Sequence, residues 1–556
     1  MRRLSALVAV LICVGPLLGV NVADASPALP SAVTAQIQGS GSTWAENAVN
    51  QWITDVTSKG LQVVYTGEGS AQGRTDFRND TTDFAVSDIG FQGYDPANQS
   101  NDTNCKNVAP KSQCRAYVYA PIVAGGTSFP YQVRAHGHLV QNLRLSGETI
   151  AKIFTLQITN WDNPEITRDN NGHQLPNTPI IPVVDSEGSG ATAQFTKYLQ
   201  TEYPGIWNPY FGRAGSTEYF PRKGAEIAEA GSDGIINFIT SAAGNGSIGY
   251  DQYSYALNKQ CGGCVEGWPV ANLENKAGYF VAPTQYNVAV ALTKAQINMN
   301  KSSANYLLQN LNQVYTNPDK RAYALSSYSY MIIPTSAHDP RMSTPKRQSL
   351  ANFIDWSICG GQAEIGPTGY SPLPINLAQA SFEQMYKLHG ADRAVQIKNL
   401  NVARKCRNPT FWAGHPDGNF LAKIAPEPPL CDKVGQGPCA PGQGVGPLGN
   451  PTHGKPPPSN NGSPSPKASG STSPSAHASA SSSTAPGAGT SGAPGASSAP
   501  GAGGNTAAGG SAANVDASQG SNSTGVLVGL ALAELVLLVA IPPFVAWLRR
   551  QRRAAR

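Results

Sequence analysis

A long stretch without large side chains divides this chain and limits what it can fold into. Residues 441–524 consist almost entirely of Pro, Gly, Ser, Ala and Thr. Such a segment has too few apolar side chains to offset its ordering entropy, so we expect a disordered stalk. A folded unit therefore has to lie before the stalk, in a body over residues 26–440. The whole chain of 556 residues is far longer than one hydrophobic core usually is, which predicts about two to four units.

The two ends of the chain carry targeting signals. Two arginines precede an apolar run and an Ala-Asp-Ala site, which is the pattern of a secretory signal peptide over residues 1–25. An uncleaved N-terminal anchor is the alternative. Residues 525–548 are apolar enough to predict a transmembrane helix. The arginine-rich tail, 549–556, favours the cytoplasmic side. We therefore expect a single-pass, membrane-anchored protein of the cell membrane, with an extracellular body and a cytoplasmic C-terminus.

Net charge excludes one class of partner. The formal charge of +5 arises mainly from the arginines of the C-terminal tail, and the body itself is close to neutral. A nucleic-acid-binding protein needs a basic surface on its folded part rather than a basic tail. We therefore expect no nucleic-acid partner.

The cysteines agree with an exported body. Of nine cysteines, Cys13 lies in the predicted signal peptide, which leaves an even number outside the cell, where disulfides are stable. Proximity in the sequence suggests the pairs Cys105–Cys114, Cys261–Cys264, Cys359–Cys406 and Cys431–Cys439, although other pairings remain open. The Cys261-Gly-Gly-Cys264 spacing also fits a redox pair or half of a zinc site, but no second such motif lies nearby. We expect a structural disulfide there.

The body reads as an alternation of strands and helices. Residues 61–65, 82–86 and 180–184 have the composition of short strands. Residues 43–56 place their large apolar side chains on one helical face, and so does the segment around Phe195. Strand, Gly/Ser loop and helix follow one another repeatedly, which is the pattern of an α/β fold.

Four Gly/Ser-rich loops lie where strands end or helices start. They are Gly39 to Thr43, Gly67 to Ser70, Val86 to Asp88, and Asp185 to Thr192. Small residues allow a ligand to approach the backbone closely, and N–H groups at helix starts attract anions. One such loop is common in any protein, since Gly and Ser also cap helices. Four of them favour a ligand site in a cleft.

These loops carry a family resemblance. The motifs are Gly39-Ser-Gly-Ser-Thr-Trp44, Tyr65-Thr-Gly-Glu-Gly-Ser70, Asp83-Phe-Ala-Val-Ser-Asp88, Ile158-Thr-Asn-Trp-Asp162 and, in part, Gly188-Ser-Gly190. In this order they resemble motifs of the periplasmic phosphate-binding proteins that serve ABC-type phosphate importers. The resemblance covers roughly residues 35–390.

The resemblance implies a two-lobe periplasmic-binding-protein fold, type II-like, in which α/β lobes close over one phosphate. Lobe I is expected at about 32–121 and 323–425, and lobe II at about 122–322. The hinge is expected near 120–126 and 323–334. The implied ligand-binding residues are Thr43, Trp44, Ser70, Asp88, Ser189, Gly190 and Thr192. Asp88 is implied to accept the proton of hydrogen phosphate, and Thr192 to replace a family threonine by a one-residue slip.

One position departs from the family pattern. Asp185 stands where the family has an arginine that grips the anion, and Glu187 and Ala191 replace its Asp and Thr. A carboxylate near a dianion is repulsive unless it is protonated or turned away. Three arginines are candidates for the missing cation: Arg74, Arg78 and Arg222.

The resulting hypothesis is an extracytoplasmic solute-binding protein that delivers phosphate or a related small anion to an ABC permease. We expect no cofactor, no metal and no enzymatic activity, since the histidines fit no catalytic or metal motif. Two alternatives remain. The body could bind a different small solute, or it could serve as a surface-displayed envelope or adhesion protein on a binding-protein scaffold.

Overall fold

The structure is a computed structural model that describes residues 34–95, 100–102, 115–264, 267–303, 305–397, 406, 408–415 and 418–439. The predicted signal peptide, stalk, membrane span and cytoplasmic tail lie outside these residues, as does the expected Cys105–Cys114 pair. Among the helices that are described, none combines the length and the apolar character needed to cross a bilayer.

The first lobe is built on a seven-stranded mixed sheet, which we call the lobe I sheet. Its strand order is β13-β6-β18-β3-β1-β2, and β19 pairs with β6. The bounds are β1 (Ile37–Gly41), β2 (Val63–Gly67), β3 (Phe84–Ser87), β6 (Tyr117–Ser128), β13 (Asp251–Gln252), β18 (Ser326–Pro334) and β19 (Tyr370–Ser371). The strands β1, β2 and β3 run parallel, so their carboxyl ends meet at one edge.

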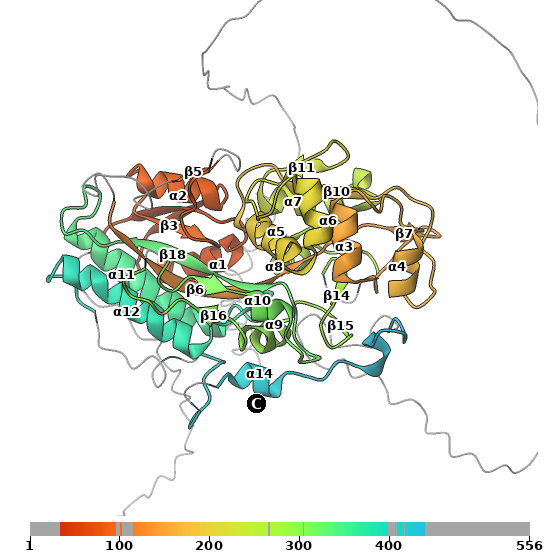
Figure 1. Cartoon of the computed structure of the whole chain (residues 1–556). Coiled ribbons are helices and arrows are strands. Elements are labelled where there is room, and N and C mark those ends of the chain that lie inside the picture. The colour runs from red at the N-terminus through yellow and green to blue at the C-terminus, as the bar shows by residue number, and fades with distance from the viewer. Residues whose placement is uncertain are drawn as a thin grey trace, which may run out of the picture. The chain divides into compact units, whose positions relative to one another are not determined.

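Helices cover both faces of the lobe I sheet (Figure 1). They are α1 (Glu46–Thr57), α2 (Ser70–Arg78), α11 (Thr344–Ile358) and α12 (Ile375–Ala391). Helix α1 buries Ala48, Val49, Trp52 and Val56, which are four of the residues that the helical spacing placed on one face. The predicted helix over 43–56 and the strands near 61–65 and 82–86 are therefore confirmed, with boundaries shifted by one to three residues.

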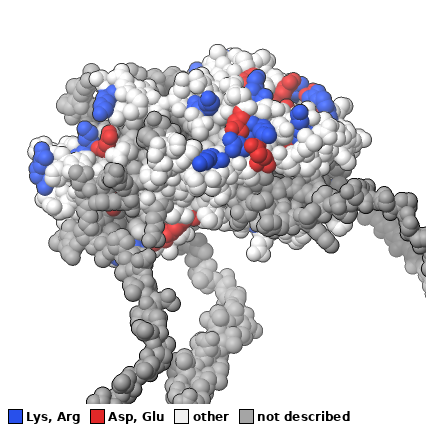
Figure 2. All heavy atoms as spheres, turned by 90° about the horizontal axis from the view of Figure 1, so that it is seen from below, with Lys and Arg blue, Asp and Glu red and all other residues white. Residues whose placement is uncertain are grey.

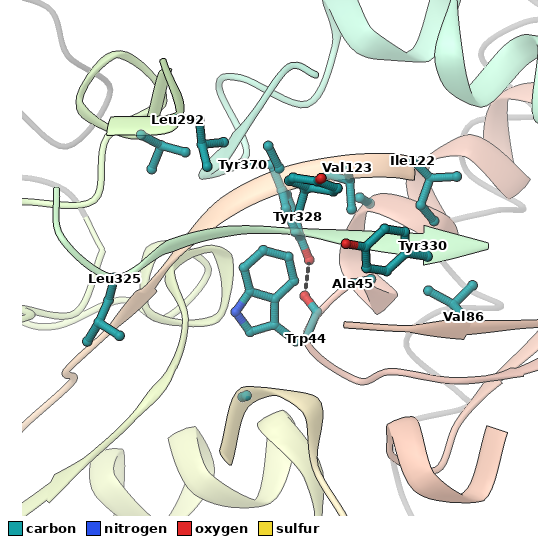
Figure 3. Close-up of a cluster of buried hydrophobic side chains, with 14 of the residues drawn as sticks. Trp44, Ala45, Val86, Ile122, Val123, Leu292, Leu325, Tyr328, Tyr330 and Tyr370 are labelled. Atoms are coloured by element: carbon teal, nitrogen blue, oxygen red, sulfur yellow. Dashed lines mark hydrogen bonds between the residues drawn. The ribbon is translucent and has the colours of Figure 1, made fainter. Parts of the chain in front are cut away.

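Trp44 forms part of the core of this lobe (Figure 3). Its ring lies edge-on to Tyr370 at 5.9 Å between centroids. The indole N–H donates to Thr127 Oγ1 at 3.2 Å, and the Tyr370 hydroxyl donates to the Trp44 carbonyl at 2.7 Å. The Trp44 side chain is 2% exposed, so it stabilises the hydrophobic core next to the loop that carries Thr43.

The second lobe holds a three-stranded parallel sheet of order β11-β10-β12. Its strands are β10 (Ile181–Asp185), β11 (Ile227–Glu229) and β12 (Ser247–Gly249), and its helices are α3 (Gly147–Phe154), α4 (Pro164–Asp169), α5 (Gly190–Glu202), α6 (Pro204–Phe211) and α7 (Gly231–Thr240). A small sheet of β9 (Arg144–Leu145), β14 (Asn272–Glu274) and β15 (Phe280–Val281) adjoins them. The predicted strand at 180–184 is β10, and α5 buries Phe195 as expected.

The two lobes are joined through β6 and β18. These strands pair antiparallel from Ser326 opposite Gly126 to Pro334 opposite Tyr117. The segments predicted as the hinge therefore lie side by side. The end of β6 continues to β13, where Thr127 and Ser128 pair with Gln252 and Asp251.

The remaining strands and helices are short. They are β4 (Gly93–Asp95), β5 (Ser100–Asp102), β7 (Arg134–Ala135), β8 (His138–Leu139), α8 (Tyr253–Leu257), α9 (Gln285–Leu292), β16 (Gln296–Ile297), β17 (Gln309–Asn310), α10 (Asn312–Tyr315) and α14 (Phe420–Ile424). Disulfides join Cys261 to Cys264, Cys359 to Cys406 and Cys431 to Cys439, as sequence proximity suggested. Charges of both signs are interspersed with neutral residues on the face seen in Figure 2.

Candidate functional site

Asp88 is the centre of the lobe I side of the site. It follows β3 directly, at the sheet edge where β1 and β2 also end, and is 3% exposed. Its carboxylate accepts hydrogen bonds from the hydroxyls of Ser42 at 2.8 and 2.9 Å, Ser70 at 3.1 Å and Ser329 at 2.5 Å. Burial raises the pKa of Asp88, while the three hydroxyls and the charge of Arg74 oppose that rise. The result is a fixed, buried acceptor.

Two of the serines that bond Asp88 lie at helix starts, where backbone N–H groups are available. Ser70 is the first residue of α2, and Ser42 lies just before α1, where its Oγ accepts from the Ala45 N–H at 3.1 Å. Within the described part of the chain, the N–H groups of Thr43, Trp44 and Ser70 donate to no acceptor. These groups carry the partial positive charge of a helix start. An anion beside Asp88 would find donors already oriented.

Thr43 and Trp44 occupy different surroundings. Thr43 Oγ1 faces lobe II, where it accepts from the Ser232 N–H at 3.4 Å and lies 3.3 Å from the Ser232 hydroxyl. The Trp44 ring, in contrast, is part of the core described above. A contact of Trp44 with a ligand is therefore available through its backbone N–H, since its indole is already bonded.

The lobe II side begins at the end of β10. Ser189 caps α5, and its hydroxyl accepts from the Thr192 N–H at 3.4 Å. Gly190, the first residue of that helix, lies directly on Asp88. A Cβ at Gly190 would stand 2.3 Å from Asp88 Oδ2 and 2.6 Å from Ser70 Oγ. Only glycine allows this approach, which brings predicted residues from both lobes together.

Thr192 is turned toward Asp185 rather than toward Asp88. Its hydroxyl donates to Asp185 Oδ2 at 2.9 Å and lies 2.7 Å from the Tyr250 hydroxyl, and its side chain has no exposed surface. The one-residue slip that would place this hydroxyl on the ligand is thus not the arrangement seen. Thr192 serves as a hydrogen-bonding partner for the unusual acid of this loop.

Two carboxyl groups make the lobe II side acidic. Burial and the nearby Glu187 raise the pKa of Asp185 to about 8, although the hydroxyls of Ser189 and Thr192 oppose the shift. Glu187 accepts from the Gly231 N–H at 3.0 Å, and burial raises its pKa as well. The raised pKa favours the neutral form of Asp185, which repels an anion less than a carboxylate does.

Arg74 supplies a buried cation on the lobe I side of the site. Its guanidinium has no exposed surface, donates to Ser87 Oγ at 2.9 Å and contacts Glu218 Oε2 at 2.5 Å. Arg222 is exposed and Arg78 is only half-buried. Of the three arginines considered as the missing cation, Arg74 is the one that the fold buries beside Asp88.

Several residues of this site carry no local sequence signal. Ser329 is 241 positions from Asp88, and Glu218 is 144 positions from Arg74. Gln194 Nε2 donates to the Asp88 carbonyl at 3.0 Å across the lobes. Ser42 lies in the Gly39 to Thr43 loop singled out in the sequence, but it was not among the predicted ligand-binding residues. In the described ranges, no group of three or more His, Cys, Asp or Glu side chains is arranged to hold a metal ion.

Comparison with known proteins agrees with this geometry. The PBP superfamily domain model matches residues 26–360. Phosphate-binding protein PstS 2 of Mycobacterium tuberculosis is 29% identical over 342 residues, which cover 61% of this chain and 83% of the relative. Phosphate-binding protein PstS of Methanocaldococcus jannaschii is 27% identical over 375 residues, or 66% of this chain and 88% of the relative.

A solved structure gives the same fold. It is a high-affinity periplasmic phosphate-binding protein, PfluDING, with bound phosphate; it matches with a TM-score of 0.51 at 19% identity, covering 66% of this chain and all of that chain. At that identity the likeness concerns the two-lobe fold. The family model matches more than half of the sequence, and the chain therefore belongs to the PBP superfamily domain family.

Proposed function

We propose that this chain captures inorganic phosphate in the cleft between its lobes and delivers it to an ABC-type permease. The observation that carries the proposal is Asp88, a buried carboxylate surrounded by oriented donors and touched by Gly190 from the opposite lobe. The relatives are named phosphate-binding proteins, which supports the same ligand.

The acceptor gives a physical basis for choosing phosphate. Hydrogen phosphate carries a proton that a carboxylate can accept, whereas sulfate is fully ionised at neutral pH and offers only lone pairs. Sulfate in the same position would face Asp88 with an unmade hydrogen bond and with like charge. A buried site that requires a hydrogen bond discriminates strongly against ligands that cannot make it.

Each predicted residue has a role in this proposal. The N–H groups of Thr43, Trp44, Ser70 and Gly190 bind the anion at the starts of α1, α2 and α5. The Ser189 hydroxyl and the Arg74 guanidinium add donors, and Asp88 takes the proton. Thr192 acts indirectly, because it fixes the Asp185 carboxyl that lies behind the loop.

Location is part of the proposal. A cleaved signal peptide, an exported body, a flexible stalk and a C-terminal anchor would keep the binding unit outside the cell within reach of its permease. The body of residues 26–440 would then act as two lobes, although β13, within the range predicted for lobe II, joins the lobe I sheet. The three disulfides of the described residues support export, because such bonds persist in oxidising compartments.

A second candidate ligand is favoured by one feature. Asp185 and Glu187 lie close to the anion-binding loops, and Asp251 Oδ2 is buried without a hydrogen-bond partner among the described residues. These acids suit a solute that carries an amine together with its anionic group. A phosphonate with an amino group is the simplest probe of that chemistry.

Calorimetric titration of the purified full chain with phosphate, sulfate, ethylphosphonate and 2-aminoethylphosphonate separates the two candidates. Phosphate capture predicts saturable heat with phosphate and much weaker binding of the other three. Tighter binding of 2-aminoethylphosphonate than of phosphate would support the second candidate instead. Heat from none of the four ligands would reject both.

A further inference from the structure

Arg74 and Glu218 form a buried ion pair between the lobes. Arg74 belongs to α2 of lobe I, and Glu218 lies in the lobe II loop between α6 and β11. Arg74 Nη2 and Glu218 Oε2 are 2.5 Å apart, and the two side chains are 0% and 3% exposed. Removing one member of such a pair leaves the other charge buried without compensation, which is why buried pairs respond strongly to truncation.

Glu218 is fixed by the same loop that carries the predicted ligand residues of lobe II. Its backbone carbonyl accepts from the Ser189 N–H at 2.9 Å. The neighbouring Thr217 exchanges two hydrogen bonds with Thr196 of α5, at 2.6 and 3.0 Å. The carboxylate is therefore attached to the start of α5, and it moves with Ser189 and Gly190 whenever the lobes move.

Arg74 is fixed on the other side by the loop that carries Asp88. Its Nη1 donates to Ser87 Oγ at 2.9 Å, and that hydroxyl donates to the Ile89 carbonyl at 2.7 Å. The guanidinium thus lies between the residue preceding Asp88 and the carboxylate of Glu218. Arg74 therefore extends from α2 of lobe I, and its guanidinium is bound by the Glu218 carboxylate of lobe II.

Other contacts between the same loops involve neutral groups. The Ala71 N–H donates to the Gly188 carbonyl at 3.0 Å, and Gln194 Nε2 donates to the Asp88 carbonyl at 3.0 Å. These contacts align the two faces, whereas the ion pair adds a charged, desolvated interaction. Charged pairs of this kind mainly control how slowly a closed state opens.

We propose that Glu218 is a positioning residue for solute capture: it latches lobe II to Arg74 and holds that guanidinium in the orientation that serves the bound anion. This inference rests on the proposed capture of phosphate. Glu218 itself does not bind the anion. Its carboxylate acts through Arg74, so its removal speeds phosphate release while association changes little.

The test uses the full chain and inorganic phosphate. Stopped-flow release and association rates are measured for the native protein and for E218Q, E218D, R74Q and R74Q/E218Q. E148Q is the matched control, since Glu148 is a half-exposed acid of lobe II in a surface pair with Lys152. We expect E218Q to speed release by about tenfold or more and to change association by less than about twofold. We expect E218D to restore part of the loss and E148Q to behave as native.

The double variant keeps the inference falsifiable if E218Q folds poorly. In the R74Q background the latch is already lost, so adding E218Q should change release by less than about twofold. Native-like or slower release by E218Q would overturn the inference, and so would an independent effect of E218Q in the R74Q background.

A failure of the proposed function would be recognised separately, because the native chain would then show no phosphate binding at all. In that case the latch is tested without ligand by small-angle scattering. A larger radius of gyration for E218Q than for the native protein supports the latch, and equal values contradict it.

Discussion

The two lobes hold their carboxyl groups in different ways at the place where they meet. On the lobe I face, Asp88 accepts hydrogen bonds from three serine hydroxyls and has the Arg74 charge nearby. On the lobe II face, Asp185 accepts a hydrogen bond from the Thr192 hydroxyl, and burial and the nearby Glu187 raise its pKa. Burial raises the pKa of both groups, but the hydroxyl donors and Arg74 oppose the rise at Asp88, whereas Glu187 adds to it at Asp185.

This difference shows that the charge of the site is set by both lobes together. Lobe II has an acid where a cation was expected, and the buried arginine comes from lobe I and is held by Glu218 of lobe II. Neither lobe alone presents a balanced anion site. We therefore expect changes on the two faces to have unequal and, at Asp88 and Asp185, opposite effects.

The largest expected difference between the lobes concerns their disulfides. Cys359–Cys406 in lobe I closes a sequence separation of 47, whereas Cys261–Cys264 in lobe II closes a separation of 3. Loop-closure entropy predicts a loss of about 4 kcal/mol when the first pair is replaced by serines and about 2 kcal/mol for the second. Urea unfolding of the two double-serine variants measures both values, and an equal loss would contradict this account.

Asp88→Asn is expected to have the next largest effect. The amide keeps the shape of the side chain, but its NH2 group is a donor that would face serine hydroxyls that also donate. This NH2 group also cannot accept the hydrogen bond that hydrogen phosphate would donate to a carboxylate oxygen. Phosphate affinity should fall by about 2–3 kcal/mol, or roughly 30- to 150-fold, and the preference over sulfate should shrink. Calorimetry with both anions measures this. An Asp88→Asn variant with native selectivity would show that the carboxylate does not select the ligand.

Asp185 should give a pH-dependent term in the free energy of unfolding. The pKa of Asp185 in the folded state, about 8, lies above its ordinary value of 3.8, so the folded state binds more protons than the unfolded state between these pH values. The contribution of Asp185 to the free energy of unfolding is therefore fully present at low pH. It is lost as the pH rises, by at most about 1.4 kcal/mol per pH unit. Asp185→Asn should remove that slope. Urea unfolding at pH 5, 6, 7 and 8 compares the two proteins, and parallel curves would contradict the assignment.

The smallest expected effect is that of Asp185→Asn on the affinity for phosphate. Above about pH 8 the ionised Asp185 repels the anion, whereas at pH 6 it is protonated and resembles an amide. Asp185→Asn should therefore tighten phosphate binding by about tenfold at pH 9, or about 1.4 kcal/mol, and by little at pH 6. Glu148→Gln, which removes the charge of a half-exposed acid elsewhere in the same lobe, is the control. Equal gains at both pH values would mean that the effect is not electrostatic.

Much of the fold could be predicted because its signals are local. The apolar spacing around Trp52 gives α1, and the Gly/Ser loops mark the ends of β1, β2, β3 and β10. The three disulfides were also predictable, because each joins cysteines that are neighbours in the order of the sequence. The same apolar spacing placed Trp44 on the apolar face, and its ring does lie in the core. The resemblance also implied a ligand contact, which the buried ring leaves to the backbone N–H of Trp44.

The site was predictable where one loop supplies several groups and obscure where two distant segments meet. Ser70, Asp88 and Gly190 were identified and lie together. Ser329 and Glu218 were missed, because a serine in a strand and an acid in a loop have no distinguishing local pattern. The proton on Asp185 also depends on burial and on Glu187, which a sequence position cannot show.

The central claim is that the cleft selects phosphate through Asp88, and one competition measurement tests it most directly. The purified full chain is titrated calorimetrically with phosphate at pH 7 in the absence and presence of excess sulfate. We predict saturable phosphate binding with a stoichiometry of one, and sulfate binding that is weaker by at least about 100-fold. Absence of phosphate binding, or equal affinity for the two anions, would contradict the account.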